Sequence, residues 1–97
     1  MLILITYDVE TITKEGRSRL RKVAKVCVNY GQRVQNSVFE CSVNPAQLVD
    51  LKKEIEGIIH SEKDSVRIYH MGKNWQHKVE TMGLDDTYDP DKGVLML

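Results

Sequence analysis

An uninterrupted apolar run opens the chain, from Leu2 to Ile5, and Thr6 and Tyr7 then lead to a single carboxylate, Asp8. A strand that is buried on both faces carries continuous aliphatic residues instead of an alternating pattern, so we predict a central, buried first strand. Ligand sites tend to lie beyond the carboxyl ends of such strands, which makes Asp8 a candidate for chemistry. The alternative is that Asp8 caps the turn that follows, because Asp bonds readily to nearby backbone N–H groups.

Apolar residues then recur at helical spacing over residues 13–30 and predict a first helix there. Its apolar face is formed by Leu20, Val23, Ala24, Cys27 and Tyr30. Arg17, Arg21 and Lys25 recur every four residues on roughly the opposite face. We predict that Gly31 stops this helix by adopting the left-handed conformation.

The segment 32–43 alternates between apolar and polar residues and predicts a strand pair with a break at Asn36 and Ser37. Its apolar positions fall on two faces, one with Phe39, Cys41 and Val43 and the other with Val34 and Val38. Asn44 and Pro45 then form a strong helix start, with an Asn cap and a Pro in the first turn. The second helix follows with a buried stripe of Leu48, Leu51, Ile55, Ile58 and Ile59.

Alternating residues over 66–71 predict a fourth strand, and Val79 to Met82 predict a short extra strand. The resulting βαββαβ order predicts an α+β fold of the ferredoxin-like class, an α/β plait with both helices on one face of an antiparallel sheet. The first strand would be central, and a second copy of the chain is the obvious cover for the open face. We place the domain at residues 1–82 and treat residues 83–97 as an acidic C-terminal tail.

A chain of 97 residues makes one small domain. A domain of this size buries only about two-thirds of its unfolded surface, so a homodimer would help to complete its core. No stretch approaches the ~18 consecutive apolar residues of a membrane span, and the apolar start lacks a basic leader. We therefore expect no membrane association and a cytoplasmic location, in which Cys27 and Cys41 are reduced core thiols.

Zero net charge hides a strong asymmetry along the chain. Half of the 14 Lys and Arg residues lie in one-fifth of its length, namely Lys14, Arg17, Arg19, Arg21, Lys22, Lys25 and Arg33. Only Glu15 opposes them, so a polyanion such as a nucleic acid could dock here. An ordinary solvated helix face is the alternative explanation. From Glu80 to Lys92 the balance is acidic, which suits a basic partner surface or simple solvation.

Several other chemistries lack their motifs. The chain has no Gly-rich phosphate loop and no paired-cysteine zinc spacing. An RNA-recognition domain would expose aromatic residues on its central strands, whereas the first strand offers only aliphatic residues until Tyr7. Plaits also serve as amino-acid sensors, and such a protein would bind a small ligand without binding nucleic acid.

Three stretches carry a resemblance to a known family. Tyr7-Asp8-Val9 ends the first strand, an Arg-rich segment begins the first helix, and the run GQRVQNSVFE at residues 31–40 is the most specific. Together they resemble the family of CRISPR-associated protein 2, over nearly the whole chain up to about Met82. The segment 64–69 and the short tail resemble the branch of that family found with type I-C systems.

The resemblance implies a homodimer of plaits in which two Asp8 residues face each other across the two-fold axis and share a divalent metal. Mg²⁺, or Mn²⁺, would activate a water and neutralise charge on the phosphate under attack, which makes Asp8 both a catalytic residue and a metal ligand. The family pattern also carries over to Tyr7, Arg19, Arg21, Arg33, Ser37 and Phe39 as nucleic-acid contacts. The basic helix face adds Arg17 and Lys25, and arginine suits phosphate because its planar fork donates two bonds.

Two roles are implied by this resemblance, and they can coexist. The first is a metal-dependent endonuclease that cleaves double-stranded DNA, or single-stranded RNA, during the acquisition of new CRISPR spacers. The second is a non-catalytic adaptor, whose dimer bridges two dimers of the CRISPR-associated protein 1 integrase and holds duplex DNA on a basic surface. Asp8 need not cleave anything in the second role, and the sequence leaves both open.

Overall fold

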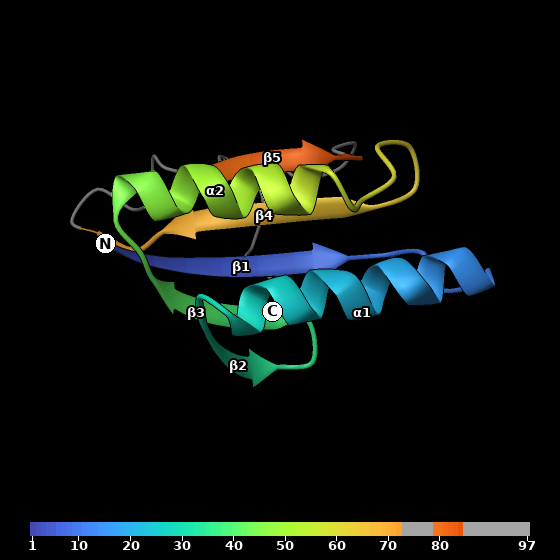
Figure 1. Cartoon of the computed structure of the whole chain (residues 1–97), viewed down its shortest axis with the longest axis horizontal. Helices are drawn as coiled ribbons and strands as arrows, with labels where there is room; N and C mark the ends of the chain where they lie inside the picture. The colour runs from blue at the N-terminus through green and yellow to red at the C-terminus, as the bar shows by residue number, and fades with distance from the viewer. Residues whose placement is uncertain (73–78, 85–97) are drawn as a thin grey trace, which may run out of the picture.

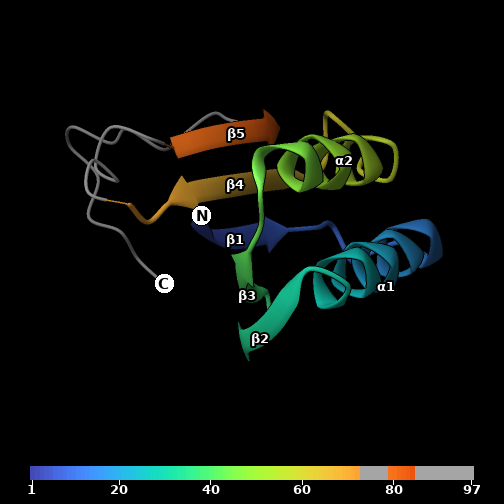
Figure 2. The ribbon, with the colours of Figure 1, turned by 60° about the vertical axis from the view of Figure 1, so that its left-hand side comes forward.

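The computed structural model describes residues 1–72 and 79–84 and contains one sheet covered by two helices. The elements are β1 (Leu2–Asp8), α1 (Lys14–Val28), β2 (Gly31–Gln35), β3 (Val38–Ser42), α2 (Pro45–Glu56), β4 (Ser65–His70) and β5 (Val79–Gly83). Neighbouring strands are antiparallel in the order β2-β3-β1-β4-β5. Both helices lie on the same face, as Figure 1 and Figure 2 show. The predicted ferredoxin-like plait with a short fifth strand is confirmed, and β1 is central.

Burial along β1 alternates, which corrects the expectation of a strand buried on both faces. Ile3 and Ile5 are fully buried beneath the helices, and Tyr7 beside them is 6% exposed. Leu2 is 42% exposed, and Leu4 is only partly buried. The physical reason is that α1 and α2 cover one face of the sheet, and no helix of the described residues packs on the other face of β1.

Side chains from five elements fill the core between the helices and the sheet. The sheet contributes Ile3, Ile5, Tyr7, Phe39, Cys41, Val66 and Ile68, and the helices contribute Val23, Cys27, Leu48, Leu51 and Ile55. The faces predicted for the 32–43 segment are confirmed for Phe39 and Cys41, which are buried, and for Val34, which is 47% exposed.

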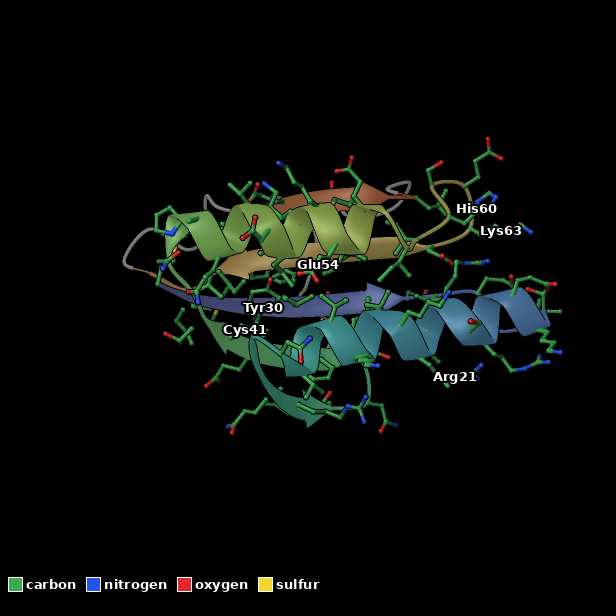
Figure 3. The ribbon with its side chains drawn as sticks, in the orientation of Figure 1. Arg21, Tyr30, Cys41, Glu54, His60 and Lys63 are labelled. Atoms are coloured by element: carbon green, nitrogen blue, oxygen red, sulfur yellow. The ribbon has the colours of Figure 1, made fainter. Side chains whose placement is uncertain are left out.

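The Tyr30 hydroxyl donates to Glu54 Oε2 at 2.7 Å and joins the end of α1 to α2 (Figure 3).

Both helix starts carry capping side chains. Thr13 Oγ1 accepts from the Gly16 N–H at 3.0 Å, and Asn44 forms a reciprocal capping box with Gln47 ahead of Pro45. The second helix is shorter than predicted and ends at Glu56. Ile58 and Ile59 therefore lie beyond the helix, although both still pack against the core.

The edge strand β5 is tied to its neighbours by one carboxylate. Glu80 Oε1 lies 2.5 Å from Lys52 Nζ of α2, and Glu80 Oε2 lies 2.5 Å from His70 Nε2 of β4. Burial opposes ionisation of Glu80, but these two partners outweigh it and lower its pKa. The sequence assigned Glu80 to an acidic segment facing solvent or a partner, and the structure instead pairs it within the chain. The rest of that segment, from Asp85 onward, lies outside the described residues.

Gly31 does not stop α1 in the way the sequence predicted. Asn29 caps the helix in a right-handed conformation, and among the described glycines only Gly83 has a positive φ. Gly31 instead begins β2, where a Cβ atom would lie 2.1 Å from the Glu40 carbonyl oxygen and 2.6 Å from Cys41 Sγ. The close approach of the two hairpin strands therefore requires glycine here.

Gly31→Ala should destabilise the protein by about 1–3 kcal/mol, because the added methyl group has to displace backbone of β3. Gly72→Ala is the matched control, since no atom of the described residues lies within 4 Å of a Cβ atom at that position. Its effect should stay within about 0.5 kcal/mol. Urea unfolding of the two variants and the wild type measures the difference, and equal stabilities would contradict the steric explanation.

Asp64 is the single buried charged residue in the described part of the chain. Its carboxylate accepts from Arg19 Nε at 2.7 Å, from the His60 N–H at 2.8 Å and from the Glu10 N–H at 3.0 Å. A buried ion is tolerated only when it is paired and hydrogen-bonded, as it is here. Burial opposes ionisation of Asp64, but these hydrogen bonds outweigh it and hold its pKa below the usual range.

Asp64→Asn should lower the free energy of unfolding at pH 7 by about 1.5–3 kcal/mol. Because the folded pKa of Asp64 lies below its unfolded value of about 3.9, the stabilisation is complete above about pH 5. It is lost as the pH falls through the folded pKa. Urea unfolding between pH 7 and pH 3 should therefore show a smaller acid-induced loss in the variant than in the wild type. Parallel curves would contradict this assignment.

Candidate nucleic-acid interface and carboxylate site

Asp8 lies at the carboxyl end of β1 with an exposed side chain. It pairs in register with Ser65 of β4 and, by the alternation of the strand, projects from the face opposite the helices. Its carboxylate forms no hydrogen bond or ion pair with any described residue. Other side chains hold the turn that follows: Thr13 caps α1, and the Glu10 carboxylate accepts from the Thr13 N–H at 2.7 Å. The capping explanation for Asp8 therefore does not hold, and the carboxylate is available to a ligand.

The β2–β3 turn is fastened to β1 beside Asp8. The Tyr7 N–H donates to the Ser37 carbonyl oxygen at 3.1 Å, and the Tyr7 hydroxyl donates to the Asn36 carbonyl oxygen at 3.4 Å. Burial raises the pKa of the Tyr7 hydroxyl, and its neighbour Arg33 partly offsets that rise. The predicted break at Asn36 and Ser37 is thus a tight turn that lies next to the candidate carboxylate.

Phe39 links the residues of this motif inside the molecule. Its ring stacks on Tyr7 with centroids 6.1 Å apart, and the Arg33 guanidinium carbon lies 5.1 Å from its centroid on the opposite strand. Phe39 is fully buried, so its ring has no surface on which a base could stack. Any contribution of Phe39 to nucleic-acid binding would therefore act through Arg33, which is exposed and oriented by a cation–π contact.

The outer surface of α1 is basic. Its exposed cations are Lys14, Arg17, Arg21, Lys22 and Lys25. Arg17 donates to the carbonyl oxygens of Thr11 and Ile12 at 3.1 and 3.2 Å, whereas Arg21 points away from α2 (Figure 3). A shallow hollow of about 410 Å³ beside the first turns of the helix is lined by Lys14, Glu15, Ser18, Arg19 and Lys22. This surface suits an extended polyanion better than a small enclosed ligand.

Arg19 belongs to the same basic segment but turns inward. Its side chain is 16% exposed, with Nε 2.7 Å from Asp64 Oδ2 and a terminal nitrogen 3.5 Å from Glu10 Oε2. The hydrogen bond to Asp64 and the nearby Glu10 raise the pKa of the guanidinium. This placement favours a structural role over the nucleic-acid contact expected from the sequence. The sequence pattern does not identify Asp64 as a site residue, and the one signal for it is its position directly before a buried strand.

Asp8 offers the type of oxygen ligand that a hard divalent cation binds, but one carboxylate supplies too few ligands for such a cation. Carboxylate oxygen is the ligand that Mg²⁺ prefers. In residues 1–72 and 79–84, however, no group of three or more His, Cys, Asp or Glu side chains could hold a metal ion. The cysteines offer no alternative, because burial raises the pKa of Cys27 to about 12 and that of Cys41 to about 11. A metal at Asp8 would need further ligands from water or a second copy of the chain.

No helix in the described ranges is long and apolar enough to cross a membrane.

Comparison with known proteins identifies the family. The family described as CRISPR associated protein Cas2 matches residues 1–79. A relative from Halalkalibacterium halodurans, named CRISPR-associated endonuclease Cas2, is 58% identical over 89 residues, which cover 92% of this chain and 93% of the relative. A relative from Chlorobaculum tepidum, named CRISPR-associated endoribonuclease Cas2, is 52% identical over the full length of both chains, 97 residues.

Solved structures agree with this assignment. The crystal structure of Streptococcus pyogenes Cas2 at pH 6.5 superposes with a TM-score of 0.71 at 63% sequence identity. The match covers 86% of this chain and 100% of that one. The sheet order, the Tyr7–Phe39–Arg33 motif and the similarity along nearly the whole chain lead to one conclusion: the chain belongs to the Cas2 family of CRISPR-associated proteins.

Proposed function

We propose that this protein is a metal-dependent endonuclease of CRISPR adaptation in which Asp8 is the catalytic carboxylate. The observation that carries the proposal is the exposed Asp8 side chain, which has no partner among the described residues and ends the central strand. A carboxylate that pairs with no described residue of its own chain is available to bind a cation. The names of the relatives, which are an endonuclease and an endoribonuclease, support phosphodiester cleavage as the reaction.

A homodimer would complete the site. The face of the sheet that carries Asp8 is left uncovered by the helices, and three apolar side chains lie on it, Leu2 at 42% exposure and Leu4 and Val38 partly buried. Two copies that pack through this face about a two-fold axis would form an isologous interface. Each Asp8 would then approach its counterpart, and the dimer would supply two carboxylates where one chain supplies one.

The proposed chemistry divides between the cation and the chain. When bound by the two Asp8 carboxylates, Mg²⁺ or Mn²⁺ would supply an activated water and neutralise charge on the phosphate. Arg33 lies on the hairpin that is fastened to the Asp8 end of β1, and its pairing with Phe39 places it on the helix side of the sheet, so its guanidinium is suited to hold a phosphate of the nucleic acid other than the one at Asp8. Tyr7 and Ser37 fix the position of that hairpin relative to the carboxylate.

Asp8→Ala should reduce metal-dependent cleavage by about 100-fold or more, because it removes the proposed ligand and catalytic group. Asp50→Ala, which removes an exposed acid from α2, is the matched control and should cleave at the wild-type rate. The variants and the wild type are purified in parallel and assayed on matched duplex DNA and single-stranded RNA with Mg²⁺, Mn²⁺ or chelator.

The substrate that is cut identifies the protein as a DNase or an RNase. Sedimentation should show that Asp8→Ala keeps the wild-type dimer mass. Equal cleavage by Asp8→Ala and the wild type would exclude Asp8 as the catalytic group.

A non-catalytic adaptor role is the second candidate, and the placement of the basic surface favours it. The exposed cations of α1 lie on the helix side of the sheet, opposite the face proposed to dimerise. They would remain on the outside of the dimer, where a DNA duplex and the CRISPR-associated protein 1 integrase could reach them. This role uses the neutralisation of phosphates and does not require cleavage.

Reversing the charge of Arg17, Arg21 and Lys25 together should weaken duplex binding and flatten its salt dependence. The slope of log affinity against log salt concentration should fall in magnitude by about 0.9 for each phosphate that these side chains neutralise in the wild type. Lys53→Glu on the exposed side of α2 is a control for non-specific charge effects and should leave the slope close to that of the wild type. Fluorescence anisotropy over a salt series gives both quantities. An unchanged slope in the triple variant would show that the duplex binds elsewhere.

A further inference from the structure

The position of Asp8 depends on the short loop that follows it, residues 9–13. Val9 is 6% exposed and anchors the first step of the loop in the core. The next backbone N–H, that of Glu10, donates to Asp64 Oδ1 at 3.0 Å. The Glu10 carboxylate then accepts from the Thr13 N–H at 2.7 Å and from Thr13 Oγ1 at 3.1 Å. The side chain of Asp64, which is distant from Asp8 in the sequence, thus holds the backbone two residues beyond Asp8.

Asp64 lies immediately before β4, the strand that pairs with the Asp8 end of β1. It directly precedes Ser65, which is the residue paired with Asp8 across the β1–β4 ladder. Its second oxygen, Oδ2, accepts from Arg19 Nε at 2.7 Å and from the His60 N–H at 2.8 Å. The carboxylate therefore joins the loop after β1, the body of α1 and the loop before β4. Figure 3 shows His60 and Lys63 of that last loop beside the beginning of α1.

The first turn of α1 is seated directly against the same loop. A Cβ atom at Gly16 would lie 1.9 Å from the Glu10 carbonyl oxygen, so only glycine permits this approach. Arg19, one turn further along, reaches back to both Asp64 and Glu10. The loop that carries Asp8 into the helix is thereby fixed from three directions.

We propose that Asp64 and Arg19 are positioning residues, which hold the Asp8 carboxylate in the geometry needed to bind a divalent cation and cleave a phosphodiester. The inference rests on the proposed nuclease function. The protein does not need a buried ion pair merely to fill this part of its core, because well-packed apolar residues can replace many buried ion pairs without loss of stability. A fixed backbone at Asp8 does matter for chemistry, since a displacement of about 1 Å at a reacting group can cost about 100-fold in rate.

The test separates positioning from stability. Asp64→Asn keeps the size of the side chain but removes its charge, and Arg19→Lys keeps a cation but loses the two-nitrogen fork. Leu48→Ala is the control, because Leu48 is a core residue in the first turn of α2, at the opposite end of that helix from the loop containing His60 and Asp64. All three are assayed with the wild type at a temperature at which each is fully folded, as checked by circular dichroism.

We expect Asp64→Asn to lower kcat by about 10-fold or more, with KM for nucleic acid changed by less than about 3-fold. Arg19→Lys should lie between this variant and the wild type, and Leu48→Ala should keep the wild-type kcat. Hydrogen exchange is the second readout, and the amides of residues 10–13 should exchange faster in Asp64→Asn and, to a smaller extent, in Arg19→Lys, but not in Leu48→Ala. If Asp64→Asn does not fold, Arg19→Lys decides the question by the same comparison.

A kcat for the folded Asp64→Asn variant equal to that of Leu48→Ala would overturn the positioning role. A wild-type protein without any Asp8-dependent cleavage would instead overturn the nuclease proposal. In that case hydrogen exchange still tests whether Asp64 holds the loop of residues 9–13 in place. Faster exchange confined to residues 10–13 in Asp64→Asn supports that role, and unchanged exchange rejects it.

Discussion

Both helices cover the same face of the sheet, and this one-sided burial determines where every other feature lies. Ile3, Ile5 and Tyr7 enter the core because they alternate onto the covered face of β1. The same alternation sends Asp8 to the open face, where no side chain of the described chain engages it. The basic surface of α1 ends up on the other side of the molecule. A single geometric constraint therefore separates the candidate cleavage site from the candidate duplex-binding surface.

The basic segment of the chain serves two purposes, and helix geometry divides them. Successive side chains on a helix point about 100° apart, so neighbouring arginines need not share a surface. Arg17 and Arg21 are exposed, whereas Arg19 lies against the β1–α1 loop and pairs with buried Asp64. The first two remain available to a polyanion, and the third stabilises the protein and fixes the loop after Asp8.

The hairpin of β2 and β3 brings the family motif together around one buried ring. Phe39 supports Tyr7 on one strand and Arg33 on another, while the turn at Asn36 and Ser37 is bonded back to Tyr7. In this arrangement the most specific stretch of the sequence is largely structural. It holds Arg33 against Phe39, on the side of the sheet opposite the one from which Asp8 projects.

The sequence alone determined the order of the elements, the capped helix start at Asn44, the family and the choice of Asp8 as a candidate, because periodicity, capping and motifs are local properties. It could not reveal that Gly31 is required by a close approach to Glu40 and Cys41, or that Arg19 turns toward Asp64. Those facts depend on residues that are far apart in the chain and meet only after folding. Tertiary structure therefore decided which members of the motif are supports and which are exposed to a ligand.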